Sequence, residues 1–307
     1  MVDDGTFKVD AAVHLWSDGK DPYTWVTDPP DSLQKKATAG CWRAEAQEAN
    51  VNCALVVQPA NHKFDHSYVA SALKRYPSHL RGMLLADGSL PPLDAISQLE
   101  ELWRQGFVAA RFNPSLFPAG LDGPTAKALF KRCGEISMPV GVMTFGGLLP
   151  HVAALRALVA HAPSTTLLID HMGFFRQPAT GGLMGAADAS NDEVAWEALL
   201  ELSSLPSVHV KVSALFRTSS EKPPHKDLAP RLGALLRAYG PTRLLWGSDW
   251  PFVLTGGNTQ TDAACDYKDA SEAIAAWGDV AGLEEPGAYE AIMGGNAQRL
   301  FGFWNGA

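Results

Sequence analysis

Short runs of β-branched and apolar residues recur along this chain, and helical patterns separate them. Eight such runs predict strands, at residues 7–14, 52–58, 80–86, 107–112, 139–144, 165–170, 207–213 and 243–247. The spacing between neighbouring runs leaves room for one crossover helix each. That arrangement is the βαβ signature of a parallel sheet.

The segments between the strands carry apolar residues at helical spacing. Such patterns predict amphipathic helices over 92–105, 151–161 and 228–239. Gly106 follows the first of these helices where a terminating glycine belongs, and Gly240 ends the third. The apolar stripes are interpreted as core-facing surfaces.

Eight βα units in one chain predict an α/β fold, a closed (β/α)₈ TIM barrel. The rival is a doubly wound open sheet, which usually has fewer strands and a glycine-rich first turn. No GxGxxG motif follows the first strand, and no GxxxxGK[ST] motif occurs. No linker-like segment divides the chain, so residues 1–307 are expected to form one domain. The longest insertions, 17–40 and 172–190, follow strands on the face where barrel active sites are built.

The composition of the chain limits the kinds of molecule that it is expected to bind and the compartment in which it is expected to work. The net charge of −8 argues against a nucleic-acid surface, and no run of 18 apolar residues is long enough to cross a membrane. The four cysteines are scattered and form no CxxC pair, which predicts free thiols in a reducing compartment. With an acidic first segment that lacks an apolar stretch, a cytoplasmic location is expected. Oligomeric state is not predictable from these patterns.

Polar residues at the carboxyl ends of barrel strands are the candidates for chemistry. The predicted strands end near His14, Arg111, His171, Arg217 and Asp249. Asp249 follows the apolar run of the last strand, where burial raises a carboxyl pKa and a neighbouring cation lowers it. It is therefore a candidate base, with a backbone-capping aspartate as the alternative.

The other four candidates also carry two interpretations. His14 and His171 either take part in catalysis or are histidines hydrogen-bonded within the core. Arg111 and Arg217 suit bidentate recognition of a substrate carboxylate, or they form salt bridges to acidic residues on loops.

The first strand has a further geometric consequence. Because side chains alternate along a strand, Asp10, Ala12 and His14 are predicted to point to the same side. A histidine at position 12 would complete a His-x-His metal pair. The methyl group of Ala12 can neither bind a metal nor donate a hydrogen bond.

Four sequence blocks together resemble the amidohydrolase superfamily. They are V-D-A-A-V-H-L-W at 9–16, I-D-H-M-G at 169–173, R-L-L-W-G-S-D-W-P at 243–251 and G-G-N-A-Q-R-L-F at 294–301. More narrowly, they resemble the amidohydrolase-related branch that contains 2-pyrone-4,6-dicarboxylate lactonase and the sugar-acid lactonases.

The resemblance implies a hydrolase that opens a small, carboxylated lactone. Asp249 corresponds to the family's general base, which activates water. His171 and His14 correspond to its histidines, which would polarise the carbonyl and stabilise the oxyanion. Arg111 and Arg217 correspond, more loosely, to its carboxylate-binding arginines.

One departure from the family pattern bears on cofactors. The usual first strand reads D-x-H-x-H, whereas this chain has Ala12 at the first histidine position. The resemblance then implies a lactonase that requires no cofactor, with a zinc site weakened and limited to His14 and Asp249. A metal-free lineage, an engineered inactivating substitution and a pseudoenzyme all remain open. So do two other functions: a zinc-dependent decarboxylase of a small unsaturated or aromatic acid, and a catalytically silent binding barrel.

Overall fold

Eight parallel strands, paired in chain order from β1 to β8, form the centre of the molecule. The computed structural model describes residues 5–174, 189–258, 265–302 and 304, so most of the insertion predicted at 172–190 lies outside the described residues. Val13 bridges to Trp250 in parallel, and the Asp249 amide donates to the Ala12 carbonyl over 2.9 Å. The ends of β1 and β8 therefore meet, and the predicted (β/α)₈ barrel is confirmed.

The strands lie where the apolar runs predicted them. Their bounds are β1 (Val9–Val13), β2 (Cys53–Val57), β3 (Leu80–Leu85), β4 (Phe107–Phe112), β5 (Val140–Val142), β6 (Leu167–Ile169), β7 (Val208–Ser213) and β8 (Leu244–Gly247). Each falls within its predicted range. The sequential pairing also excludes the doubly wound open sheet, whose strand order reverses.

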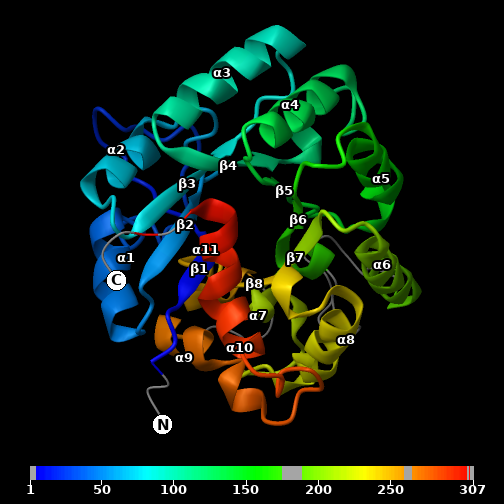
Figure 1. The fold of residues 1–307 in the computed structure, drawn as a ribbon. Helices are drawn as coiled ribbons and strands as arrows, with labels where there is room; N and C mark the ends of the chain where they lie inside the picture. The colour runs from blue at the N-terminus through cyan, green and yellow to red at the C-terminus, as the bar shows by residue number, and fades with distance from the viewer. Residues whose placement is uncertain (1–4, 175–188, 259–264, 303, 305–307) are drawn as a thin grey trace.

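Helices surround the ring of strands (Figure 1). Their bounds are α1 (Ala39–Glu48), α2 (Ser67–Arg75), α3 (Pro92–Arg104), α4 (Pro124–Glu135), α5 (Val152–His161), α6 (Ala189–Glu201), α7 (Leu215–Thr218), α8 (Ala229–Tyr239), α9 (Tyr267–Glu272), α10 (Ala288–Glu290) and α11 (Asn296–Phe301). The three helices predicted from apolar spacing correspond to α3, α5 and α8. Gly106 follows α3 with a φ of 100°, as expected of a terminating glycine.

Two apolar clusters fix which end of the barrel is free for chemistry. The larger cluster lies between the strands and the helices, where Val56, Phe112 and Trp246 alternate with inward-facing residues. The smaller cluster fills one end of the interior, with Leu55 and Leu245 packed in the same group as Phe301 of α11. Figure 1 shows α11 lying across this end of the ring. The opposite end, formed by the carboxyl ends of the strands, is left for polar side chains.

The alternation predicted for the first strand is wrong at Asp10. The pairing of β1 with β2 shifts register between Asp10 and Val13. The Asp10 carboxylate accepts a hydrogen bond from Tyr267 of α9, outside the strands, whereas the Ala12 methyl faces Gly247 of β8. The irregularity separates Asp10 from Ala12, which a strict period of two would have kept together.

None of the helices among the described residues combines the length and the apolar character needed to cross a membrane. All four cysteines carry free thiols, as predicted.

Candidate active site

The five predicted site residues line one cavity at the carboxyl ends of the strands. The cavity holds about 410 Å³, and His14, Arg111, His171, Arg217 and Asp249 all contribute to its wall. Arg111 lies in β4, and Arg217 lies in α7, the short helix after β7. His14, His171 and Asp249 follow the ends of β1, β6 and β8 by one or two residues. In a barrel of this kind, that end is where active sites are built.

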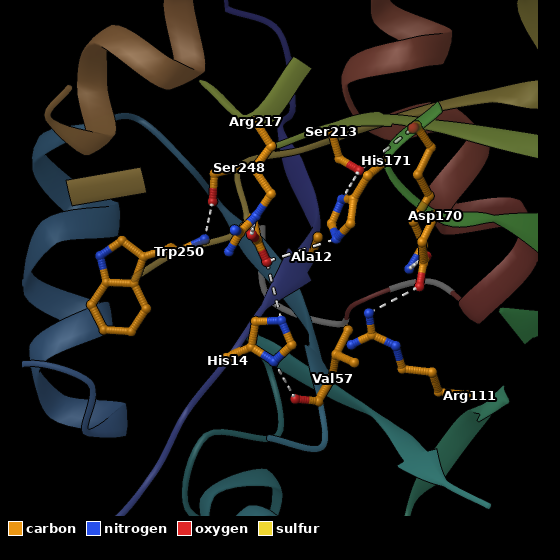
Figure 2. Close-up of polar contacts among 12 residues, drawn as sticks. Ala12, His14, Val57, Arg111, Asp170, His171, Ser213, Arg217, Ser248 and Trp250 are labelled. Atoms are coloured by element: carbon orange, nitrogen blue, oxygen red, sulfur yellow. Dashed lines mark hydrogen bonds and ion pairs between the residues drawn. The ribbon is translucent and has the colours of Figure 1, made fainter. Parts of the chain in front are cut away.

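Asp249 is the centre of this group. It is 2% exposed, with Arg217 Nε 2.8 Å from its Oδ2 atom and His14 Nε2 3.2 Å from its Oδ1 atom. His171 Nε2 lies 3.9 Å from the same Oδ1 atom. Figure 2 shows the rings of His14 and His171 turned toward the same point, which Arg217 reaches from a third side.

The charge of Asp249 follows from these neighbours. Burial on its own raises the pKa of this carboxyl, but the positive charge of Arg217, followed by the contributions of His171 and His14, outweighs it. The pKa of Asp249 therefore lies well below its ordinary range. The group is ionised despite being buried.

The backbone orients His14. Its Nδ1 atom lies 3.1 Å from the Val57 carbonyl oxygen (Figure 2). A carbonyl only accepts, so Nδ1 must carry the hydrogen and Nε2 faces Asp249.

His171 is held from the other side. Its Nδ1 atom lies 2.8 Å from the Ser213 hydroxyl oxygen, and burial lowers the pKa of His171 to about 4 even though Asp249 opposes this shift. The imidazole is therefore neutral at neutral pH. The Ser213 hydroxyl has one hydrogen, with Nδ1 at 2.8 Å and the Lys211 carbonyl oxygen at 3.4 Å. We assign this hydrogen to the nearer Nδ1, which leaves the ring hydrogen on Nε2.

Arg111 belongs to a second charged group beside the first. Its Nη2 atom lies 3.3 Å from Asp170 Oδ2, and Lys211 Nζ lies 2.9 Å from Asp170 Oδ1. Burial on its own raises the pKa of Asp170, but the positive charges of Lys211 and then Arg111 lower it by more than burial raises it. This carboxyl is therefore also ionised. Both arginines thus form the salt bridges that were the alternative to substrate binding, and both also face the cavity.

Left-handed backbone places several of these side chains. His171, Ala214 and Asp249 have φ values of 52°, 51° and 67° at the ends of β6, β7 and β8. Such a conformation costs a non-glycine residue about 1–2 kcal/mol. It persists only where the surroundings hold it, and it concentrates at functional sites.

The family model for the amidohydrolases matches residues 9–303. The chain belongs to the amidohydrolase family. The resemblance drawn from the four sequence blocks is therefore confirmed.

Characterised relatives of this amidohydrolase include lactone hydrolases. A 4-sulfomuconolactone hydrolase from Hydrogenophaga intermedia is 30% identical over 199 residues, which cover 64% of this chain and 59% of that protein. This match spans less than two thirds of the relative's length. An L-fucono-1,5-lactonase from Burkholderia ambifaria is 24% identical over 82% of this chain and 83% of its own.

Solved structures give the same family picture. A Pseudomonas putida protein assigned as a 2-pyrone-4,6-dicarboxylic acid hydrolase superposes with a TM-score of 0.73 at 26% identity, covering 97% of this chain and 98% of that one. A Burkholderia multivorans amidohydrolase with bound zinc shares the fold, with a TM-score of 0.70 at 18% identity over 97% and 99% of the two chains.

The residues of this amidohydrolase do not fit a zinc site of the kind that the family suggests. Position 12 supplies a methyl group, and Oδ2 of Asp249 is already bonded to Arg217. Across residues 5–174, 189–258, 265–302 and 304, no three or more His, Cys, Asp and Glu side chains are grouped so that they could hold a metal ion. A structural or catalytic zinc ion needs three or four such ligands.

The site contains residues to which sequence reasoning gave no role. Asp170 and Lys211 form the ion pair that supports Arg111, and Asp10 with Ser248 holds the loop that carries Asp249. Lys211 had a signal, because a lysine at an inward position of the apolar strand β7 must be paired. The role of Asp10 had none, because it depends on the irregularity in β1.

Proposed function

We propose that this amidohydrolase hydrolyses a small lactone that carries an acidic group, and that it does so without a metal. The observation that carries the proposal is the ionised, buried Asp249 between two imidazoles at the wall of the cavity. The lactone hydrolases among its relatives support the same reaction class.

The proposed reaction begins with water. Asp249 accepts a proton from a water molecule as its oxygen attacks the ring carbonyl, and His171 donates from Nε2 to the oxyanion that forms. The ester C–O bond then breaks, leaving a carboxylic acid, which ionises by releasing its proton to water, and an alkoxide. His14 lies 3.2 Å from Asp249, so it can pass the abstracted proton to the departing oxygen, which becomes a hydroxyl group.

The acidic group is inferred from charge. Arg111, Lys211 and Arg217 are three cations with side chains at most 10% exposed, against two carboxylates, Asp170 and Asp249. These five buried groups sum to one positive charge. A third carboxylate, Asp28 at the cavity wall, is exposed, so solvent screens its charge and the buried excess favours an anionic ligand. Arg111 lines the cavity, and its Nη2 atom contacts Asp170 at 3.3 Å.

The shape of the cavity suits a ring. Aromatic side chains of Trp16, Phe145, Phe174 and Phe252 line it together with the charged groups. Such walls bind an apolar ring face, while a few polar groups fix its orientation. A carboxylated or sulfonated lactone matches both features.

The test compares the parent protein with Asp249→Asn on a panel of carboxylated, sulfonated and neutral lactones, with and without a chelator, and identifies the products. We expect the parent to open the acidic lactones to hydroxy acids with the chelator present. Asp249→Asn should be at least about 100-fold slower, because the positioned base is lost. Asp87→Asn is the matched control, since Asp87 binds Ser89 and does not line the cavity. Equal turnover by the parent and Asp249→Asn would contradict the assignment of Asp249.

The same experiment separates the alternatives. A zinc-dependent decarboxylase would release carbon dioxide and lose activity with the chelator. A silent barrel would turn over nothing on the panel. Activity that appears only after Ala12→His would identify a disabled enzyme.

A further inference from the structure

Asp10 lies outside the cavity, yet it is bonded to the segment that carries Asp249. It is fully buried, and four hydrogen-bond donors converge on its two oxygens. The amides of Ala12 and Ser248 donate to Oδ1 over 3.0 and 2.9 Å. The hydroxyl groups of Ser248 and Tyr267 donate to Oδ2.

The direction of each hydroxyl hydrogen is fixed by a further contact. The Ser248 hydroxyl accepts from the Trp250 amide over 2.8 Å, and the Tyr267 hydroxyl accepts from the Trp42 indole over 3.2 Å. Both hydroxyl hydrogens therefore point to Asp10. Because all four partners donate, the network fits a carboxylate, and an amide NH₂ group at position 10 would oppose donors.

These contacts bracket Asp249. Ser248 before it and Trp250 after it are tied, directly or through the serine hydroxyl, to Asp10. The Asp249 amide donates to the Ala12 carbonyl, and the Trp250 indole donates to Glu45 over 2.8 Å. Asp249 itself has a φ of 67°, a conformation that its surroundings must hold.

We propose that Asp10 is a positioning residue for the lactonase reaction: through Ser248 it holds the Asp249 peptide in its left-handed conformation and so aims the carboxylate at the reacting water. This inference rests on the proposed function. Asp10 touches no substrate and acts only through Ser248 and Trp250. A displacement of about 1 Å in a catalytic group can lower a rate about 100-fold.

The variants follow from the hydrogen-bond directions. Asp10→Asn keeps the size of the side chain but presents an NH₂ group to two hydroxyls that already donate. Ser248→Ala removes the hydroxyl that links Asp10 to the Trp250 amide. Asp10→Glu restores the charge with one more methylene group. Asp87→Asn removes a carboxylate of similar chemistry, bonded to Ser89 in another loop.

Steady-state kinetics on an acidic lactone form the first readout. We expect Asp10→Asn to lower kcat about 10- to 100-fold with little change in KM, because the cavity wall is untouched. Asp10→Glu should recover part of the loss. The Asp10→Asn, Ser248→Ala double variant should lose little more than the worse single variant, because both break one linkage. A kcat unchanged in folded Asp10→Asn, even with lower thermal stability, would overturn the proposal.

Hydrogen exchange gives a second readout that needs no substrate. The amides of Ser248 and Trp250 should exchange at least about tenfold faster in Asp10→Asn than in the parent, while Asp87→Asn matches the parent. If the parent opens no lactone, the proposed function fails, and this readout alone decides the role of Asp10. Unchanged exchange would overturn it. If Asp10→Asn does not fold, Ser248→Ala carries both measurements, with the same outcomes deciding.

Discussion

A carboxyl group as deeply buried as Asp249 would bind a proton at neutral pH if it had no cationic neighbour. Arg217, 2.8 Å away, is the strongest of the groups that oppose burial and hold the pKa of Asp249 low. His171 stays neutral, because burial outweighs the nearby carboxylate. The site thus combines an ionised acid with an uncharged imidazole, which are the states that a base and an oxyanion donor need.

The role of Arg217 predicts a shift in pH dependence. Arg217→Met removes the charge that lowers the pKa of Asp249 and leaves the burial that raises it. The acid limb of the kcat/KM profile should therefore move to higher pH. Arg231→Met, which removes a cation paired with Glu193, should leave that limb in place. If the acid limb of the kcat/KM profile lies at the same pH in Arg217→Met as in the parent, the assignment of Asp249 as the base is contradicted.

The raised pKa of Asp10 predicts that its contribution to the stability of the fold falls as the pH rises. Burial is the largest cause and raises its pKa from 3.8 to about 6, although hydrogen bonds from Ser248, Ala12 and Tyr267 lower it in part. The folded state then binds the proton more tightly than the unfolded state does. The contribution of Asp10 to stability is therefore complete below about pH 4 and is lost as the pH rises through about 6.

Asp10→Asn isolates this effect, because all other titrating groups are common to both proteins. The free energy of unfolding of the parent, relative to Asp10→Asn, should fall by on the order of 3 kcal/mol between pH 4 and 7. Urea unfolding at a series of pH values measures it. A difference that is constant with pH, or that grows, would be inconsistent with a raised pKa at Asp10.

At the scale of strands and helices, most of the fold was predictable. Apolar runs located all eight strands because a parallel barrel strand is buried on both faces and is therefore rich in apolar residues. The five candidate site residues were also predictable, because a polar residue at the end of an apolar run stands out from the buried segment before it. They are His14, Arg111, His171, Arg217 and Asp249. Their roles stay predictions until the variants are measured.

The partners of these residues were not predictable. Asp10 was placed with Ala12 because a period of two was assumed, and a register shift in β1 breaks that period. Tyr267, which bonds to Asp10, is 257 positions away in the sequence. Contacts of this kind arise from tertiary packing, which neither residue type nor local spacing reports.

Close packing between β1 and β8 gives a prediction at this scale. A Cβ atom added at Gly247 would lie 2.9 Å from the Ala12 Cβ and 3.1 Å from the Ser213 Cβ. Gly247→Ala should lower the free energy of unfolding by about 1–3 kcal/mol because the strands must separate to admit it. Gly146→Ala, with no atom within 4 Å of the added Cβ, is the control. Equal stabilities of the two variants would show that β1 and β8 are less tightly packed.

At the scale of the whole molecule, the net charge and the charge of the site have opposite signs. The chain carries −8, whereas the five buried charged groups beside the cavity sum to +1. The proposed preference for an acidic ligand follows the local charge and not the overall one, because buried charges are screened much less than exposed ones.

This contrast predicts how Arg111 acts on different substrates. Arg111→Met should raise KM for an acidic lactone about 10-fold or more, since a charge-assisted hydrogen bond contributes about 1.5–3 kcal/mol. KM for a neutral lactone of the same ring size should stay nearly constant. Asp170 keeps Lys211 as a partner in this variant. A similar rise in KM for both substrates would mean that Arg111 acts through the shape of the cavity.

The central claim is that residues that follow β1, β6, β7 and β8 assemble around one carboxylate that drives hydrolysis unaided by a metal. The most direct measurement is kcat of metal-stripped parent and metal-stripped Asp249→Asn on one carboxylated lactone. The account predicts sustained turnover by the parent and a loss of at least about 100-fold in the variant. A parent that works only after zinc is returned, or a variant as fast as the parent, would contradict it.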